Sequence, residues 1–161
     1  MSAGADFRAL TLFVVRHGQT EDNAAGILSG QNDSPLTDLG RAQARKNGVL
    51  LKELAGDLSR TDFFASSLHR ACTTMEILRE GASLSPRAYR ADRRLMESDF
   101  GDWSGTNYDQ LKVVDKARWD ARERDRWNWV APHGESYAQL HKRVGPFLET
   151  LRRDAVILGP P

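Results

Sequence analysis

A short apolar run that ends abruptly in charged residues constrains the fold of this chain more than any other segment. Leu10–Val15 (LTLFVV) is nearly continuous in apolar, often β-branched residues, and Arg16, His17 and Gly18 follow it at once. Such a run is typical of a buried strand in a parallel sheet. Even with Ala9 included, it is far shorter than the ~20 residues that a helix needs to cross a bilayer, and no small-residue cleavage site follows. We therefore expect an α/β domain, with neither a membrane span nor a signal peptide.

Strand and helix patterns alternate along the rest of the chain. Thr37 is the expected N-cap of a helix in which apolar residues recur at helical spacing until Gly56. The other expected elements are, in order, a strand at Asp62–Ala65, a helix at Leu68–Arg79, a weak strand at Arg87–Ala91, a loop at Arg93–Thr106, partial helix at Asp109–Asn128, a helix at Glu135–Arg153 interrupted by Gly145 and Pro146, and a last strand at Asp154–Leu158. Trp119, Trp127 and Trp129 fit either a lid over a substrate or indoles packed on a solvated helix. The alternation predicts an α/β three-layer sandwich with a mostly parallel central sheet and helices on both faces.

Composition limits the compartment and the classes of partner. The 161 residues fit one domain, which we expect to span residues 1–161 with a disordered start at residues 1–8. The net charge of +1 provides no overall field that would attract nucleic acid or an anionic membrane. Cys72 is the single cysteine, so no intrachain disulfide can form, and we expect a reducing, cytoplasmic location.

Residues that suit a phosphoryl group follow three of the expected strands. In such folds the ligand lies beyond the carboxyl ends of the strands, where Arg16 with His17, Ser66–Arg70 and Glu97 fall. The arginines can bind phosphoryl oxygens, and the free backbone amides at Ser66–Arg70 favour an anion. Gly18 lets the backbone approach a ligand closely. Spacing alone leaves His17 three roles, as a nucleophile, a proton carrier or a hydrogen-bonded structural residue.

Five strings in the sequence carry a more specific signal. They are FVVRHGQTEDN within Leu12–Asn23, then Gly30–Ala44, Ser66–Thr74, Leu95–Leu111 and His133–Arg143. In content, order and spacing these strings resemble the histidine phosphatase superfamily, the phosphoglycerate mutase-like proteins. The resemblance covers residues 10–158, and it implies a phosphoglycerate mutase-like fold.

The resemblance also implies a role for each matching residue. His17 matches the nucleophile that becomes phosphorylated, and Arg16 and Arg70 match the phosphate-binding arginines. Glu97 matches the residue that protonates the leaving group and then accepts a proton from water. The other matches are substrate-binding residues, namely Asn23, Ser29 and Gly30. The resemblance implies no metal and no cofactor.

One feature of the family has no counterpart in the sequence. The family carries a second histidine just after its last strand, whereas Gly159, Pro160 and Pro161 follow the expected strand Asp154–Leu158. We therefore expect a fold without the family's usual last helix, and turnover lower by roughly 10²–10³ for one lost stabilising donor. The remaining histidines do not follow a strand: we expect His69 and His141 on helix surfaces and His133 in a loop.

The expected function is a phosphoric monoester hydrolase that acts on a small phosphorylated metabolite or a phosphoprotein through a phosphohistidine. A phosphoglycerate mutase is the alternative within the family, but Phe100–Gly105 and Asp33–Thr37 resemble the phosphatase form. The alternative from another class is a catalytically weak phosphate-binding or partner-binding protein. A homodimer is a further expectation, since an uncovered apolar sheet face invites association.

Overall fold

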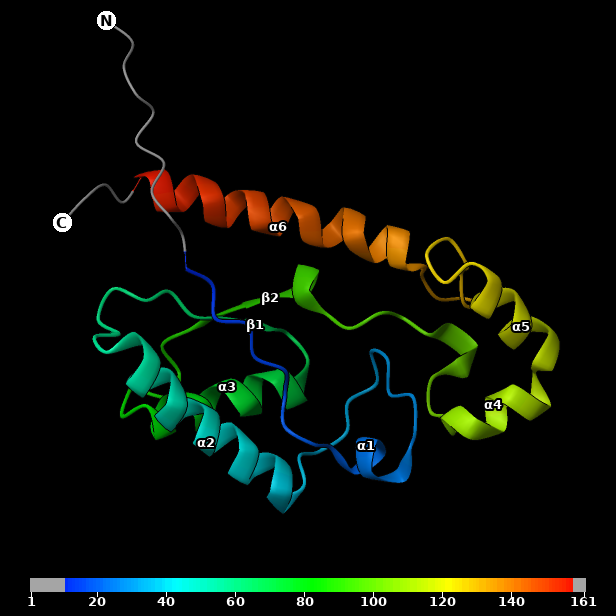
Figure 1. Ribbon diagram of the computed structural model, residues 1–161, viewed down its shortest axis with the longest axis horizontal. Coiled ribbons are helices and arrows are strands. Elements are labelled where there is room, and N and C mark those ends of the chain that lie inside the picture. The colour runs from blue at the N-terminus through cyan, green and yellow to red at the C-terminus, as the bar shows by residue number, and fades with distance from the viewer. Residues whose placement is uncertain (1–10, 158–161) are drawn as a thin grey trace, which may run out of the picture.

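The computed structural model describes residues 11–157 of the chain, and the side chains of residues 11–153. Its centre is a parallel sheet formed by β1 (Phe64–Ser66) and β2 (Arg90–Asp92), in which Phe64 lies opposite Arg90. Helices α2 (Asp38–Ala55) and α3 (His69–Gly81) lie on one side of these strands, and α6 (Tyr137–Ile157) lies on the other (Figure 1). The expected α/β layering with a parallel sheet is confirmed, whereas the predictions for residues 1–8 lie outside the described residues.

Shorter elements connect these layers. They are α1 (Glu21–Ala25), the 3₁₀ turns η1 (Arg93–Leu95) and η2 (Gly101–Trp103), α4 (Tyr108–Val114) and α5 (Lys116–Arg124). Thr37 caps α2 as expected, because its hydroxyl accepts a hydrogen bond from the amide of Gly40 at 3.1 Å. No helix in the part of the chain that the structure describes combines the length and the hydropathy that crossing a membrane requires.

Helices α2 and α3 pack closely because glycines lie where they meet. A Cβ atom on Gly48 of α2 would lie 2.0 Å from the carbonyl oxygen of Leu78 in α3, and one on Gly81 would lie 2.5 Å from that of Arg45. Beside this contact, α2, α3 and the segments that follow them share a core of buried side chains, namely Leu51, Leu58, Phe63, Leu78 and Ala82. The close approach of the two backbones therefore sets how α3 lies relative to α2.

The expected first strand does not form in the described residues. Residues 11–19 adopt no regular structure, and Val14 is 90% exposed; Leu10 lies outside the described residues. A strand needs a neighbour to satisfy its amides and carbonyls, and no other strand of the described chain lies alongside this segment. Its apolar side chains instead line an open groove of about 660 Å³ together with Leu50 and Leu54 of α2.

The sequence prediction for the C-terminal region is also wrong. Helix α6 runs without interruption through Gly145 and Pro146, and residues 154–157 continue it instead of forming a strand. A proline inside a helix costs about 3 kcal/mol. Phe147 offsets much of this cost, because it is only 5% exposed and meets the ring of Phe64 edge to face at 5.3 Å. Extending a helix costs less than starting a strand that has no neighbour. Leu158 and the expected absence of a last helix lie beyond the described residues.

The indoles near α5 are packed rather than arranged as a lid. Trp103 is buried, and its ring centroid lies 6.1 Å from that of Trp119 and 4.6 Å from that of Trp129. The indole N–H of Trp103 donates to Asp115 at 2.9 Å. Trp127 lies outside this cluster and is exposed. The aromatic cluster therefore joins η2 to α5.

Replacement of Gly48 by alanine tests the close approach of α2 and α3. We expect Gly48→Ala to lower the free energy of unfolding by about 1–3 kcal/mol, because the new methyl group meets backbone that cannot move alone. Gly145→Ala in α6 is the matched control: no atom lies within 4 Å of its Cβ position, so the gain in helix propensity of about 1 kcal/mol should stand. Urea unfolding of both variants measures the difference, and equal effects would contradict the packing described.

Candidate active site

His17 lies at the end of the extended segment, half-buried and surrounded by charged groups. Burial lowers the pKa of its imidazole below the usual value of 6.5. The positive charges of Arg70 and Arg16 lower that pKa further, whereas the carbonyl of Gly18 and the carboxylate of Glu97 partly raise it. Arg16, Arg70 and Glu97 therefore lie within electrostatic reach of His17, and the imidazole favours its neutral form.

The tautomer of His17 follows from its hydrogen bond. Nδ1 lies 2.8 Å from the carbonyl oxygen of Gly18, and a carbonyl can only accept. Nδ1 therefore carries the proton, and Nε2 keeps its lone pair. A neutral imidazole with a free Nε2 beside two arginines is the form that can attack phosphorus.

The backbone around His17 is held by both α2 and α3. A Cβ atom on Gly18 would lie 2.2 Å from the carbonyl oxygen of Gly40, so only glycine allows the segment to lie against α2. The amide of Gly18 donates to the hydroxyl of Thr74 at 3.1 Å, and that hydroxyl donates to the carbonyl of Arg70 at 2.7 Å. The close approach expected of Gly18 is thus made to helix α2 rather than to a ligand, and Thr74 links the positions of His17 and Arg70.

Arg70 is almost completely buried, and the loop before α2 surrounds its guanidinium. Nη2 donates to the carbonyl of Gly30 at 2.7 Å, and Nη1 donates to that of Asn32 at 2.8 Å. Gly30 presents its carbonyl from a backbone with φ of +55°, which suits glycine. The carboxylate of Asp33 lies 3.6 Å from Nη1 and balances the charge.

Asp33 also occupies the N-terminus of α3. Its two carboxylate oxygens accept the amides of His69 at 2.7 Å and Arg70 at 3.1 Å. The expectation that the amides of the Ser66–Arg70 turn bind a ligand anion is wrong for these two donors. A carboxylate of the chain itself lies there, so no ligand is needed to satisfy them.

Glu97 lies on the irregular segment between η1 and η2, and its side chain is exposed. Its Oε1 accepts the amide of Ser98 at 2.8 Å. Its own carbonyl accepts hydrogen bonds from Gln31 at 3.3 Å and from Arg143 of α6 at 2.9 Å. The backbone of Glu97 is therefore fixed by two distant segments, while the carboxylate stays accessible.

The expected substrate-binding residues make structural contacts. Asn23 forms a reciprocal capping box with Thr20 at the start of α1, with two hydrogen bonds of 3.2 Å. Ser29 is buried and donates to Asp22 at 2.8 Å. Gly30 holds Arg70 through its carbonyl. Their part in substrate binding stays a prediction, because these contacts shape the loop and no bound ligand tests them.

The remaining histidines have partners of their own. His69 is exposed on α3 near Thr73, His133 lies 2.9 Å from Asp102 in a loop, and His141 of α6 faces Trp127. Their expected places on helices and in a loop are confirmed. Among the side chains that the structure describes, no group of three or more His, Cys, Asp or Glu is arranged to hold a metal ion. The expectation that catalysis needs no metal stays a prediction.

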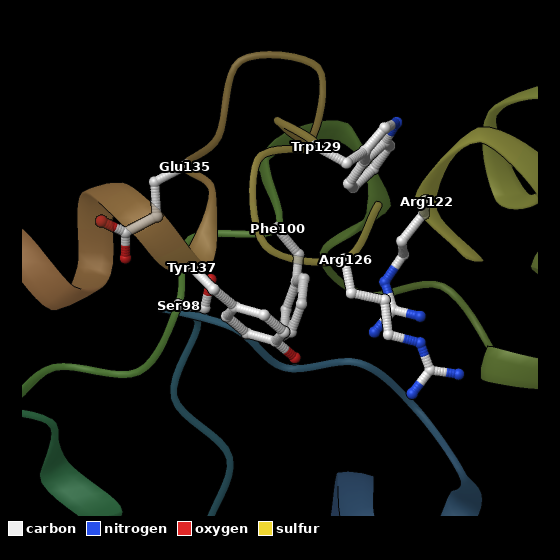
Figure 2. A pocket seen from close by; sticks show the side chains of 7 residues that line it. All are labelled: Ser98, Phe100, Arg122, Arg126, Trp129, Glu135 and Tyr137. Atoms are coloured by element: carbon white, nitrogen blue, oxygen red, sulfur yellow. The ribbon is translucent and has the colours of Figure 1, made fainter. Parts of the chain in front are cut away.

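A hollow next to the Glu97 segment adds aromatic and cationic side chains to this end of the molecule. Figure 2 shows the residues that line it, which are Ser98, Phe100, Arg122, Arg126, Trp129, Glu135 and Tyr137. Arg122 and Arg126 share the carboxylate of Glu123. The ring of Phe100 lies 3.2 Å from the position of a Cβ on Gly30, so the hollow borders the loop that surrounds Arg70.

Comparison with known proteins identifies the family. A sequence model of the histidine phosphatase superfamily (branch 1) matches residues 12–156 of the chain. The chain belongs to this superfamily. The chain is 36% identical over 146 residues to a glucosyl-3-phosphoglycerate phosphatase of Mycobacterium tuberculosis, a match that covers 89% of this chain and 61% of the relative. It is 35% identical over 136 residues to a 2,3-bisphosphoglycerate-dependent phosphoglycerate mutase of Azorhizobium caulinodans, covering 84% of this chain and 65% of the relative.

Solved structures confirm the phosphoglycerate mutase-like fold. The alpha-ribazole phosphatase of Shigella flexneri has a TM-score of 0.74 at 28% identity, and the match covers 88% of this chain and 66% of that one. The mycobacterial glucosyl-3-phosphoglycerate phosphatase in complex with VO3 has a TM-score of 0.68 at 33% identity, covering 85% of this chain and 64% of that one. The chain thus spans less than two thirds of the length of several proteins that it matches.

Sequence reasoning missed three residues that hold the site together. Asp33 orders the N-terminus of α3, Thr74 links Gly18 to Arg70, and Arg143 holds the Glu97 segment. Thr74 carries a local signal, since it follows Arg70 by four residues and its hydroxyl can reach that carbonyl. Asp33 and Arg143 form hydrogen bonds with residues far away in the sequence, so no local signal predicts these contacts.

Substitution of Thr74 tests the link between His17 and Arg70. In Thr74→Val the amide of Gly18 keeps no hydrogen-bond acceptor, so we expect a loss of about 1–3 kcal/mol of stability and weaker binding of inorganic phosphate. Thr73→Val, one residue earlier and less buried, should leave both nearly unchanged. Isothermal titration with phosphate and thermal unfolding measure the two effects. A Thr74→Val variant that behaves like Thr73→Val would contradict the link.

Proposed function

We propose that this chain forms the phosphoryl-transfer site of a phosphomonoester hydrolase in which His17 is transiently phosphorylated. One observation carries the proposal: a half-buried imidazole with a lowered pKa and a free Nε2 lies among Arg70, Arg16 and Glu97. The family membership and the phosphatases among the relatives support it.

In the first step of the proposed reaction, Nε2 of His17 attacks phosphorus and the bond from phosphorus to the ester oxygen breaks. Arg16 and Arg70 stabilise the charge on the non-bridging oxygens. Protonated Glu97 gives its proton to the leaving oxygen, so the alcohol departs neutral. In the second step Glu97 takes a proton from water, which attacks phosphorus and releases inorganic phosphate and free His17.

Two other activities remain as candidates. Mutases are among the relatives, so a phosphoglycerate mutase is the alternative within the family. Conversion of 3-phosphoglycerate that depends on 2,3-bisphosphoglycerate would favour it, whereas release of phosphate without that cofactor favours the phosphatase. Weak turnover, or phosphate binding alone, is the third candidate.

The substrate of the proposed phosphatase is a small phosphorylated metabolite or a phosphoprotein. A panel of phosphate esters, assayed with this chain, measures which of these substrates it prefers.

Trapping the covalent intermediate tests the nucleophile. A phosphohistidine is acid-labile and alkali-stable, so brief reaction with a ³²P-labelled ester followed by an alkaline quench should leave label on His17. His17→Ala should abolish the label. His69→Ala is the control and should retain it, because His69 is an exposed residue at the start of α3 and is not the proposed nucleophile. Label that survives acid, or label on Ser66 or Cys72, would refute the mechanism.

The leaving group decides whether Glu97 is the general acid. Glu97→Gln should reduce the rate with alkyl phosphates by roughly 10²–10⁴, because the departing alkoxide then receives no proton. The loss should be much smaller with p-nitrophenyl phosphate, whose leaving group needs little protonation. Glu53→Gln, on the exposed face of α2, serves as the control. Equal losses with both esters would rule out this role for Glu97.

A further inference from the structure

We infer that Arg143 and Glu135 act together as positioning residues for Glu97. The inference rests on the proposed function, in which the Glu97 carboxyl exchanges the proton. Neither residue needs to touch a substrate in this role. Their ion pair instead fixes the backbone on both sides of the residue that does.

Arg143 of α6 reaches two carbonyls of the Glu97 segment. Its Nη1 donates to the carbonyl of Arg94 in η1 at 2.8 Å, and its Nη2 donates to the carbonyl of Glu97 itself at 2.9 Å. These two acceptors are three residues apart along the chain. One guanidinium therefore spans the backbone from Arg94 in η1 to Glu97.

Glu135 completes the arrangement from the other side. Its carboxylate binds Arg143 in a bidentate manner, with Nε to Oε2 at 3.1 Å and Nη2 to Oε1 at 2.5 Å. Oε1 also accepts the amide of Asp99 at 3.1 Å, and the amide of Glu135 donates to the carbonyl of Asp99 at 2.8 Å. Asp99 is thus held through both its donor and its acceptor, two residues after Glu97.

The Glu97 segment depends on these contacts because it has no regular structure of its own. Residues 96–100 lie in neither a helix nor a strand, and the Glu97 side chain is exposed. The side chains of Arg143 and Glu135 are 24% and 16% exposed, so solvent screens their pairing only in part. A general acid must lie within hydrogen-bond reach of the leaving oxygen, and a displacement of about 1 Å can cost 10²-fold in rate.

Arg143→Lys tests the inference with the charge retained. An ammonium group cannot donate to two separate carbonyls and bind a carboxylate in a bidentate manner at once. We expect single-turnover phosphorylation of His17 by alkyl phosphates to slow about tenfold to a hundredfold. The rate with p-nitrophenyl phosphate should change less than threefold. Arg118→Lys, in an exposed ion pair on α5, is the control and should change neither rate.

A double variant separates positioning of Glu97 from a general loss of structure. If Arg143 acts through Glu97, then Glu97→Gln combined with Arg143→Lys should be no slower than Glu97→Gln alone. Multiplying losses, or equal losses with both esters, would overturn the inference. Glu135→Gln keeps an acceptor for the amide of Asp99 while removing the ion pair, and it should give the same ester-selective loss if Arg143→Lys fails to fold.

The same experiment distinguishes this inference from the proposed function. One outcome is that Glu97→Gln slows the reaction of alkyl phosphates selectively, whereas Arg143→Lys does not. This outcome would overturn the inference and leave Glu97 as the proposed general acid. Glu97→Gln with no ester selectivity would remove the proposed acid, and the positioning role would fall with it.

Discussion

Burial of the Arg70 guanidinium is the constraint on which the site depends. The residue is 3% exposed and carries a permanent charge, and such burial is strongly unfavourable unless hydrogen bonds and an opposite charge compensate it. The carbonyls of Gly30 and Asn32 and the carboxylate of Asp33 supply that compensation. The loop before α2 must therefore fold against the start of α3.

That requirement extends to His17. The carbonyl of Arg70 accepts the hydroxyl of Thr74, and the same hydroxyl receives the amide of Gly18. Gly18 in turn lies against the carbonyl of Gly40 in α2, and Gly40 lies against the backbone of Gln19, so closely that neither glycine can carry a side chain. His17, Arg70 and helices α2 and α3 are thus fixed relative to one another by these contacts. The contacts keep His17 partly buried, and this burial is the main cause of its lowered pKa.

The elements predicted correctly carry their signals locally. Thr37 and the helical spacing after it identify α2, and β1 and α3 lie within one or two residues of their predicted starts. Leu10–Val15 has an equally clear strand pattern, but a strand is a property of two segments, and residues 11–15 lack a neighbouring strand in the described chain. Pro146 shows the converse case, because a distant aromatic contact of Phe147 overrides a strong local signal for a break.

In the candidate site, too, some residues could be predicted from the sequence and others could not. Strand ends and family strings point to His17, Arg70 and Glu97, and the structure places Arg70 and Glu97 within electrostatic reach of His17. The residues that hold them were not predicted, because Asp33, Thr74 and Arg143 act on backbone groups 36 to 56 residues away in the sequence. Hydrogen bonds between residues so far apart in the sequence produce no periodic pattern that a single sequence could reveal. The hollow around Arg122 and Tyr137 likewise gathers residues from several segments.

The reaction proposed for His17 needs a neutral imidazole with its proton on Nδ1. A nuclear magnetic resonance titration of the chain with ¹⁵N-labelled histidine measures this form, with His17→Ala to assign the signal. We expect a His17 pKa below 6.5, a free Nε2, and a higher pKa in Arg70→Gln, where one positive charge is removed. A His17 pKa at or above 6.5, or a free Nδ1, would rule this form out.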